Sequence, residues 1–176
     1  MNTETIKRRI KEDFGFVDNP IPTGWGTNSI NLWITKQNLT DKNIIAIRLY
    51  GRIMSRLNKT VEYANSKAGC DCIIDGIKKE VRMATVSKDV CTLNQIKLDQ
   101  SWDDIIVVLF FHNREEIYET SKENFINICK EQRGKILWNG GKKIIKADKI
   151  LNQEEDGDFN IAMDINIFGE KFDKII

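Results

Sequence analysis

The chain has 176 residues, of which 41% are hydrophobic and 30% charged, with 27 basic and 26 acidic side chains. This length suits one compact domain with its own core, and the balanced charge excludes a generally polybasic protein, so any surface for a polyanion must come from local clusters. The first residues carry no apolar signal core and no apolar run approaches a membrane span, so we expect a soluble cytoplasmic protein that does not contact membranes.

We expect a single domain over residues 1–176, in which residues 1–39 form an N-terminal extension of helix and loop. The clearest helix begins at Thr40 or Asp41 and continues through Leu57, because apolar residues recur there with helical period. Three arginines follow the flank of this helix at every fourth position: Arg48, Arg52 and Arg56. They could run beside a nucleic-acid backbone, or they could be solvated or paired with acids elsewhere in the chain.

The segment around Asp75 and Gly76 predicts a β-hairpin, because Asp-Gly between two runs rich in Ile and Val favours a two-residue turn with positive φ. With this loop Ile74 pairs with Ile77, and Asp71 lies opposite Glu80. Side chains alternate along a strand, so one face carries both acids and Arg82. The other face is mostly apolar and is expected to face the core; it includes Cys70 and Cys72.

Two opposed carboxylates destabilise a sheet unless a cation lies between them. Their oxygens, with water or a backbone carbonyl, suit a hard divalent ion such as Mg²⁺, with Mn²⁺ as a possible substitute. The alternative is a surface hairpin whose acids are neutralised by Lys78 and Arg82. The four cysteines form no paired Cys-x-x-Cys motif and are expected to be free thiols, with a structural zinc site as the alternative.

The pattern Gly69-Cys70-Asp71, followed by Asp75-Gly76, Glu80-Val81-Arg82 and Asn94-Gln95-Ile96, resembles the PD-(D/E)XK nuclease superfamily, especially its small members that are similar to type II restriction endonucleases. The resemblance implies that Asp71 and Glu80 bind Mg²⁺, with the Val81 carbonyl as a further ligand. It also implies a catalytic role for Arg82, a catalytic role for the Gln95 side chain through a hydrogen bond to a phosphate or to metal-bound water, and a contact of Lys97 with the nucleic-acid backbone. The alternative for Gln95 and Lys97 is an ordinary exposed turn. The chain departs from the family at Arg82, which stands in the place of a lysine. A guanidinium stays charged, so Arg82 can orient water or hold a phosphate but cannot act as a base.

Further along the chain, residues 105–111 form a continuous apolar run that predicts a central strand buried on both faces. Residues 115–120 are expected to form a strand, and a helix is expected to start at residues 121–124. We expect a hairpin around residues 139–141 and an edge strand within residues 160–168. Lys142 and Lys143 belong to a second basic cluster, which could contact nucleic acid.

Strands and helices alternate through the middle of the chain, so the expected fold is α/β, with a central mixed sheet flanked by helices. The resemblance implies the same kind of core, that of the restriction endonuclease-like proteins. The expected function is that of a Mg²⁺-dependent endonuclease acting on double-stranded DNA. It would act as a homodimer if both strands are cut. Three alternatives remain: a repair or nicking nuclease, a non-catalytic nucleic-acid-binding protein that keeps the nuclease fold, and an interaction protein whose hairpin is only structural.

Overall fold

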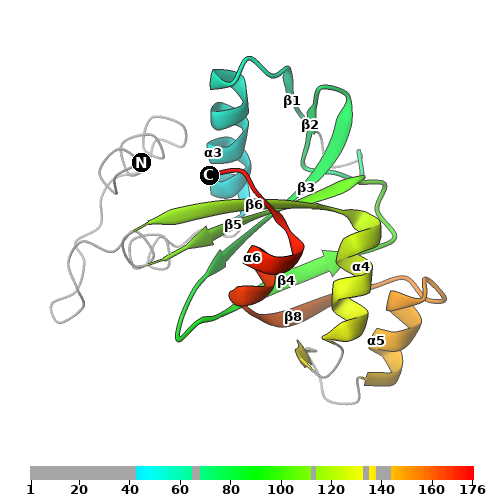
Figure 1. Cartoon of the computed structure of the whole chain (residues 1–176). Helices are drawn as coiled ribbons and strands as arrows, with labels where there is room; N and C mark the ends of the chain where they lie inside the picture. Colours follow the sequence, from blue (N-terminus) through cyan, green and yellow to red (C-terminus); the bar gives the residue numbers. More distant parts are fainter. Residues whose placement is uncertain (1–42, 65–67, 112–113, 133–134, 138–143) are drawn as a thin grey trace, which may run out of the picture.

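Two β-sheets and four helices make up the part of the chain that the structure, a computed structural model, describes: residues 43–64, 68–111, 114–132, 135–137 and 144–176. The helices are α3 (Asn43–Arg56), α4 (Lys122–Glu131), α5 (Ile144–Leu151) and α6 (Asn166–Lys171) (Figure 1). The expected extension over residues 1–39 lies outside the described residues. Among the described residues, none of the helices has the length and hydrophobicity of a membrane span.

The larger sheet is mixed and has six strands in the order β1-β2-β3-β5-β6-β9. Its strands are β1 (Val61–Tyr63), β2 (Cys72–Ile74), β3 (Ile77–Thr85), β5 (Asp104–Phe110), β6 (Glu115–Ser121) and β9 (Asp173–Lys174). Neighbouring strands are antiparallel except β3 and β5, which are parallel. The predicted α/β fold with a central mixed sheet and flanking helices is therefore confirmed.

The smaller sheet is antiparallel and has three strands in the order β4-β8-β7. Its strands are β4 (Val90–Lys97), β8 (Asp158–Asp164) and β7 (Ile136–Leu137). The chain thus leaves the larger sheet after β3, forms β4 in the smaller sheet, and returns as β5 beside β3. The connection between the parallel strands contains a strand of another sheet where a helix is more usual.

Strand β5 is buried on both faces, as its continuous apolar sequence predicts. Ile106, Val108 and Phe110 belong to a core that the larger sheet forms with α3. Ile105 and Val107 face a second and larger core, which lies between the two sheets. Strand β5 therefore separates two hydrophobic cores.

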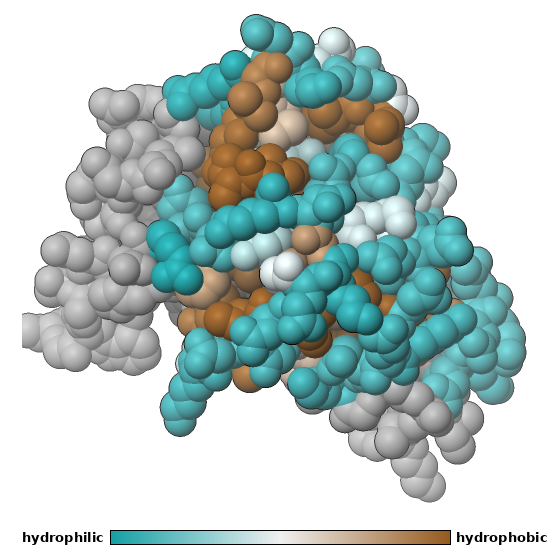
Figure 2. Space-filling model, viewed as in Figure 1, coloured by the Kyte–Doolittle hydropathy of each residue, from teal (hydrophilic) through white to brown (hydrophobic). Residues whose placement is uncertain are grey.

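Helix α3 covers the first of these cores with the apolar side that its sequence predicts. The buried residues of this side are Ala46, Leu49, Tyr50, Ile53 and Met54. On the face shown in Figure 2, hydrophobic side chains gather over α3, and a band of hydrophilic side chains crosses the molecule below it. The predicted helix is thus confirmed within residues 43–56.

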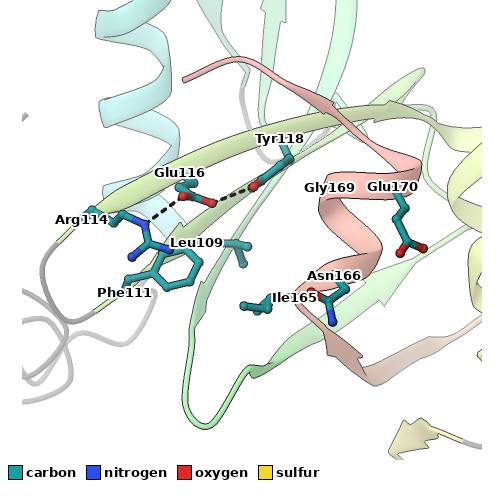
Figure 3. A pocket seen from close by; sticks show the side chains of 9 residues that line it. All are labelled: Leu109, Phe111, Arg114, Glu116, Tyr118, Ile165, Asn166, Gly169 and Glu170. Carbon is teal, nitrogen blue, oxygen red and sulfur yellow. Dashed lines mark hydrogen bonds and ion pairs between the residues drawn. The ribbon is translucent and has the colours of Figure 1, made fainter.

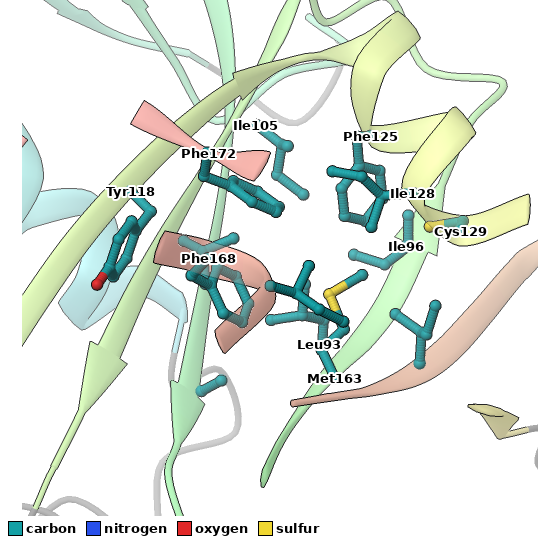
Figure 4. Packing of buried hydrophobic residues seen from close by; sticks show 14 of the residues in the cluster. Leu93, Ile96, Ile105, Tyr118, Phe125, Ile128, Cys129, Met163, Phe168 and Phe172 are labelled. Atoms are coloured by element: carbon teal, nitrogen blue, oxygen red, sulfur yellow. The ribbon is translucent and has the colours of Figure 1, made fainter. Parts of the chain in front are cut away.

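The core between the sheets is rich in aromatic residues, which include Phe125 of α4, Phe168 of α6 and Phe172 directly after α6. Phe125 lies edge-on to Trp102, with ring centroids 6.3 Å apart. The ring centroids of Phe168 and Phe172 are 4.7 Å apart, and Figure 4 shows both side chains in this core with Phe125. Helix α4 begins where the sequence predicts, because the Ser121 hydroxyl accepts a hydrogen bond from the Asn124 N–H as its N-cap.

Residues 139–141, the centre of an expected hairpin, lie outside the described residues; its second strand does not extend into residues 144–151, which are helical in α5. Two other expectations about the fold were wrong. The expected edge strand is β8, which pairs on both sides and lies in the middle of its sheet, while residues 166–171 turn into α6. Cys70 and Cys72 do not share a face, because Cys70 belongs to the core between the sheets and Cys72 to the α3 core. All four cysteines are buried free thiols, as predicted.

Candidate active site

The predicted hairpin forms between β2 and β3. Asp75 and Gly76 take φ values of 50° and 84°, which is the backbone that a two-residue turn of this kind requires. The Asp75 carboxylate also accepts a hydrogen bond of 2.9 Å from the Thr60 N–H and lies 2.8 Å from the Lys59 ammonium. The strand pairs are Ile74 with Ile77, Ile73 with Lys78, and Cys72 with Lys79, as predicted.

Asp71 does not pair across from Glu80, and in this respect the predicted register was wrong. The ladder ends at Cys72, and the Asp71 N–H donates to the Lys79 carbonyl at 2.9 Å. The Asp71 carboxylate instead turns toward β3, where its Oδ2 accepts a hydrogen bond of 2.8 Å from the Val81 N–H. Asp71 is thereby fixed beside β3 by its side chain and its backbone together.

Glu80 and Arg82 lie on the face of β3 that is turned toward the core between the two sheets. Val81, which alternates with them, belongs to the α3 core on the opposite face. Glu80 is 2% exposed and Arg82 is 8% exposed. The expectation that this face of the hairpin lies outside the core was therefore wrong, because the smaller sheet covers it.

The Arg82 guanidinium lies between the two acids. Its Nη1 is 3.4 Å from Asp71 Oδ2 and donates to the Val81 carbonyl at 3.1 Å. Its Nη2 forms an ion pair with Glu80 Oε1. The sequence resemblance assigns three groups as metal ligands: the carboxylates of Asp71 and Glu80 and the carbonyl of Val81. All three face the Arg82 guanidinium.

Burial has a strong effect on the Glu80 carboxyl group. Loss of solvent raises the pKa of Glu80 to about 7, although the Arg82 guanidinium lowers this pKa; the nearby Asp71 carboxylate raises it further. Glu80 Oε1 forms its ion pair with Arg82, and no other group among the described residues donates a hydrogen bond to it. The guanidinium is therefore the group that compensates this buried carboxylate oxygen.

Gln95 reaches the cluster through its backbone. It lies in an irregularity of β4, where the pairing with β8 shifts between Leu93 and Ile96, and its φ is 56°. Its carbonyl accepts a hydrogen bond of 3.1 Å from Arg82 Nη2, and its N–H donates to the Asn160 side chain at 2.8 Å. The Gln95 side chain is exposed. Sequence reasoning missed Asn160, because nothing near residue 160 indicates which strand it faces.

The basic residues predicted to contact nucleic acid lie in different parts of the chain. Lys97 is exposed on β4, and its charge lowers the pKa of Glu80. Arg48, Arg52 and Arg56 belong to α3, which packs on the opposite face of the larger sheet, and the Arg48 guanidinium lies 3.9 Å from the centre of the Tyr63 ring. Lys142 and Lys143 fall outside the described residues.

The donor set fits a hard divalent ion by its chemistry. Two carboxylates and a backbone carbonyl are oxygen ligands of the kind that Mg²⁺ and Mn²⁺ prefer, and they already face a cationic group. Within the described ranges there is no group of three or more His, Cys, Asp or Glu residues that could hold a metal ion, so such a site would need the carbonyl or water. A metal ion and the Arg82 guanidinium would use the same oxygens.

A hollow of about 310 Å³ lies elsewhere, between the ends of β5 and β6 and helix α6 (Figure 3). Its wall contains Glu116, whose carboxylate accepts hydrogen bonds from Tyr118 at 2.7 Å and from Arg114 at 2.9 Å. Burial raises the pKa of Glu116, but these hydrogen bonds and one from Lys174 outweigh it and lower the pKa to about 2. The lining contains no residue of the hairpin cluster, so the hollow is a separate feature.

The structure brings together the four residues singled out as catalytic, namely Asp71, Glu80, Arg82 and Gln95. Comparisons of the sequence with models of known protein families and with curated proteins give no match. The functional interpretation therefore depends on the geometry and chemistry of this cluster.

Proposed function

We propose that this protein is a divalent-metal-dependent endodeoxyribonuclease similar to the PD-(D/E)XK nucleases. One observation carries the proposal: the carboxylates of Asp71 and Glu80 and the carbonyl of Val81 converge on a single cationic group. Two acids and a carbonyl gathered in this way from one hairpin are a suitable ligand set for Mg²⁺ or Mn²⁺.

In this proposal Asp71, Glu80 and Val81 would hold the ion. When bound, a divalent ion lowers the pKa of water and neutralises charge that develops on a phosphodiester. Arg82 remains charged throughout and can donate its N–H groups to a phosphate oxygen, with the Gln95 carbonyl holding it in place. Lys97, exposed on the neighbouring strand, adds positive charge for the nucleic-acid backbone.

Double-stranded DNA is the proposed substrate, and cutting both strands requires two such sites, which a homodimer would supply. A restriction enzyme and a nicking or repair nuclease differ in their products. Incubation with supercoiled plasmid distinguishes them, because linear product indicates that both strands are cut, and relaxed circles that persist indicate nicking.

Plasmid cleavage with Mg²⁺ or Mn²⁺ tests the proposal. Asp71→Asn and Glu80→Gln should each lower the cleavage rate about a hundredfold or more, while binding to DNA is retained. The matched control is Asp75→Asn, a change to an exposed acid in the turn of the same hairpin, where asparagine also accepts positive φ. Cleavage at the wild-type rate by the Asp71 variant would remove Asp71 from the site.

A second candidate is a non-catalytic nucleic-acid-binding protein with the same fold, and the ion pairs of Arg82 with both acids favour it, because they neutralise the charge that would attract a metal ion. Salt-sensitive DNA binding without cleavage at any metal concentration would support this candidate. Arg82→Lys separates the two further, because lysine can lose its proton and position water, so a gain of cleavage would indicate that arginine impairs the site.

A further inference from the structure

Two hydrogen bonds in series connect the smaller sheet to the Arg82 guanidinium, and the first of them is made by Asn160. Strand β8 pairs with β4 through Leu93 with Ile161 and through Ile96 with Phe159. Two residues of β4, Asn94 and Gln95, therefore lie opposite the single residue Asn160. This is the arrangement of a β-bulge, which redirects the backbone of the longer strand.

The bulge turns the Gln95 carbonyl toward the larger sheet, where it accepts the hydrogen bond from Arg82 Nη2. Gln95 has φ of 56°, a left-handed backbone that a residue other than glycine keeps only where its surroundings hold it. The Asn160 Oδ1 provides such a hold, because it accepts the Gln95 N–H at 2.8 Å.

Asn160 is itself fixed by its place in the sheet. It lies in the middle strand, and its backbone pairs with Leu137 of β7 on the side away from β4. The side chain is half-buried. A short chain of contacts therefore runs from the middle of the smaller sheet through Gln95 to the guanidinium between the two acids.

We propose that Asn160 is a positioning residue, which fixes the β4 bulge so that the Gln95 carbonyl holds the Arg82 guanidinium beside Asp71 and Glu80. The expected effect of Asn160 on DNA cleavage rests on the proposed nuclease function, whereas its expected effect on the Arg82 guanidinium does not. Asp71 and Glu80 would change partners on binding a metal ion, so the Arg82 guanidinium needs a hydrogen-bond acceptor that stays the same. The Gln95 carbonyl is that acceptor. Asn160 sets the position of that carbonyl from a strand 65 residues away in sequence.

The direct test observes Arg82 without reference to catalysis. In protein labelled with ¹⁵N-arginine, NMR signals of the Arg82 guanidinium, assigned by their loss in Arg82→Lys, report how fast its Nη groups rotate. Asn160→Leu keeps the side-chain size but removes the acceptor, so rotation should become roughly five to ten times faster. Asn160→Asp keeps an oxygen at the same position and should preserve the wild-type signals. Asn152→Leu, a change at an exposed asparagine after α5, is the matched control.

Unchanged Arg82 signals in Asn160→Leu would overturn the proposal, and so would equal loss of the signals in Asn160→Asp. If Asn160→Leu does not fold, Asn160→Ala gives the same comparison.

Cleavage assays add a second and separable readout. If the wild-type protein cuts plasmid, Asn160→Leu should lower kcat several-fold with KM unchanged, and Asn160→Asp should recover it. Equal kcat in Asn160→Leu and the wild type would overturn the proposal, as would a change confined to KM. If the wild-type protein does not cut, the nuclease function fails, and the NMR comparison alone decides the role of Asn160.

Discussion

Replacement of Arg82 by methionine should destabilise the protein by about 3 kcal/mol. The change removes the guanidinium and keeps a long apolar side chain, so Glu80, which is 2% exposed, loses its ion-pair partner inside the core. Breaking a fully buried pair costs about 3–5 kcal/mol. The lower end applies here for two reasons: the Asp71 side chain is 24% exposed, and Glu80, with its pKa of about 7, can take up a proton.

The cost should also depend on pH. Without the guanidinium, the pKa of Glu80 should rise further above the value of about 7 that it has beside Arg82. A carboxyl group whose folded pKa lies above its unfolded pKa contributes its full stability below the unfolded value and loses it as the pH rises through the folded value. The substitution should therefore cost about 1 kcal/mol more at about pH 8 than at about pH 6.

Urea unfolding at both pH values measures these differences in the free energy of unfolding. Arg56→Met, a change at an exposed arginine of α3, is the control and should alter stability by less than about 0.5 kcal/mol. Adding Glu80→Gln to Arg82→Met removes the buried charge and should recover part of the loss. A cost below about 1 kcal/mol for Arg82→Met at both pH values would refute the view that the guanidinium stabilises these acids.

Three further outcomes are expected from other parts of the molecule. Lys79→Met should cost about 2 kcal/mol in urea unfolding, because Lys79 is 5% exposed and forms ion pairs with Asp104 and Glu119, whose side chains remain 22% and 28% exposed. Glu116 has a folded pKa of about 2, below its ordinary value of 4.5, so it contributes stability above that ordinary value and loses it as the pH falls toward 2. Glu116→Gln should therefore reduce stability at neutral pH by up to about 3 kcal/mol and flatten the acid limb of a stability–pH curve. Gly169→Ala should raise the free energy of unfolding by about 0.5–1 kcal/mol, because the glycine is in helix α6 and an added Cβ would meet nothing within 4 Å.

Local sequence signals predicted the parts of the fold that local interactions determine. The Asp75-Gly76 turn sets the pairing of residues 72–74 with residues 77–79, and the Ser121 hydroxyl marks the start of α4. The apolar run of β5 predicted a strand buried on both faces, although not which layers would cover it. Each of these signals depends on residues that are close together in the sequence, so it can be interpreted without knowing where distant segments lie.

The remaining features depend on contacts between segments far apart in the sequence. An edge strand was expected within residues 160–168, but β4 and β7 pair with β8 on both sides. The irregularity at Asp71 and the bulge at Gln95 also could not be predicted, because each depends on the strand that lies opposite. For the same reason the sequence indicated Gln95 by its side chain, whereas its carbonyl contacts Arg82.

The reactivity of the four buried cysteines can report how the folded structure opens. Burial raises the pKa of Cys72 and of Cys91 to about 12, and it raises the pKa of Cys129 as well, so these thiols stay protonated and sheltered from modifying reagents while the chain is folded. Cys72 lies in the α3 core and the other two lie between the sheets. The order in which an alkylating reagent modifies them would therefore reveal which layer separates first, or whether both cores come apart in one cooperative event.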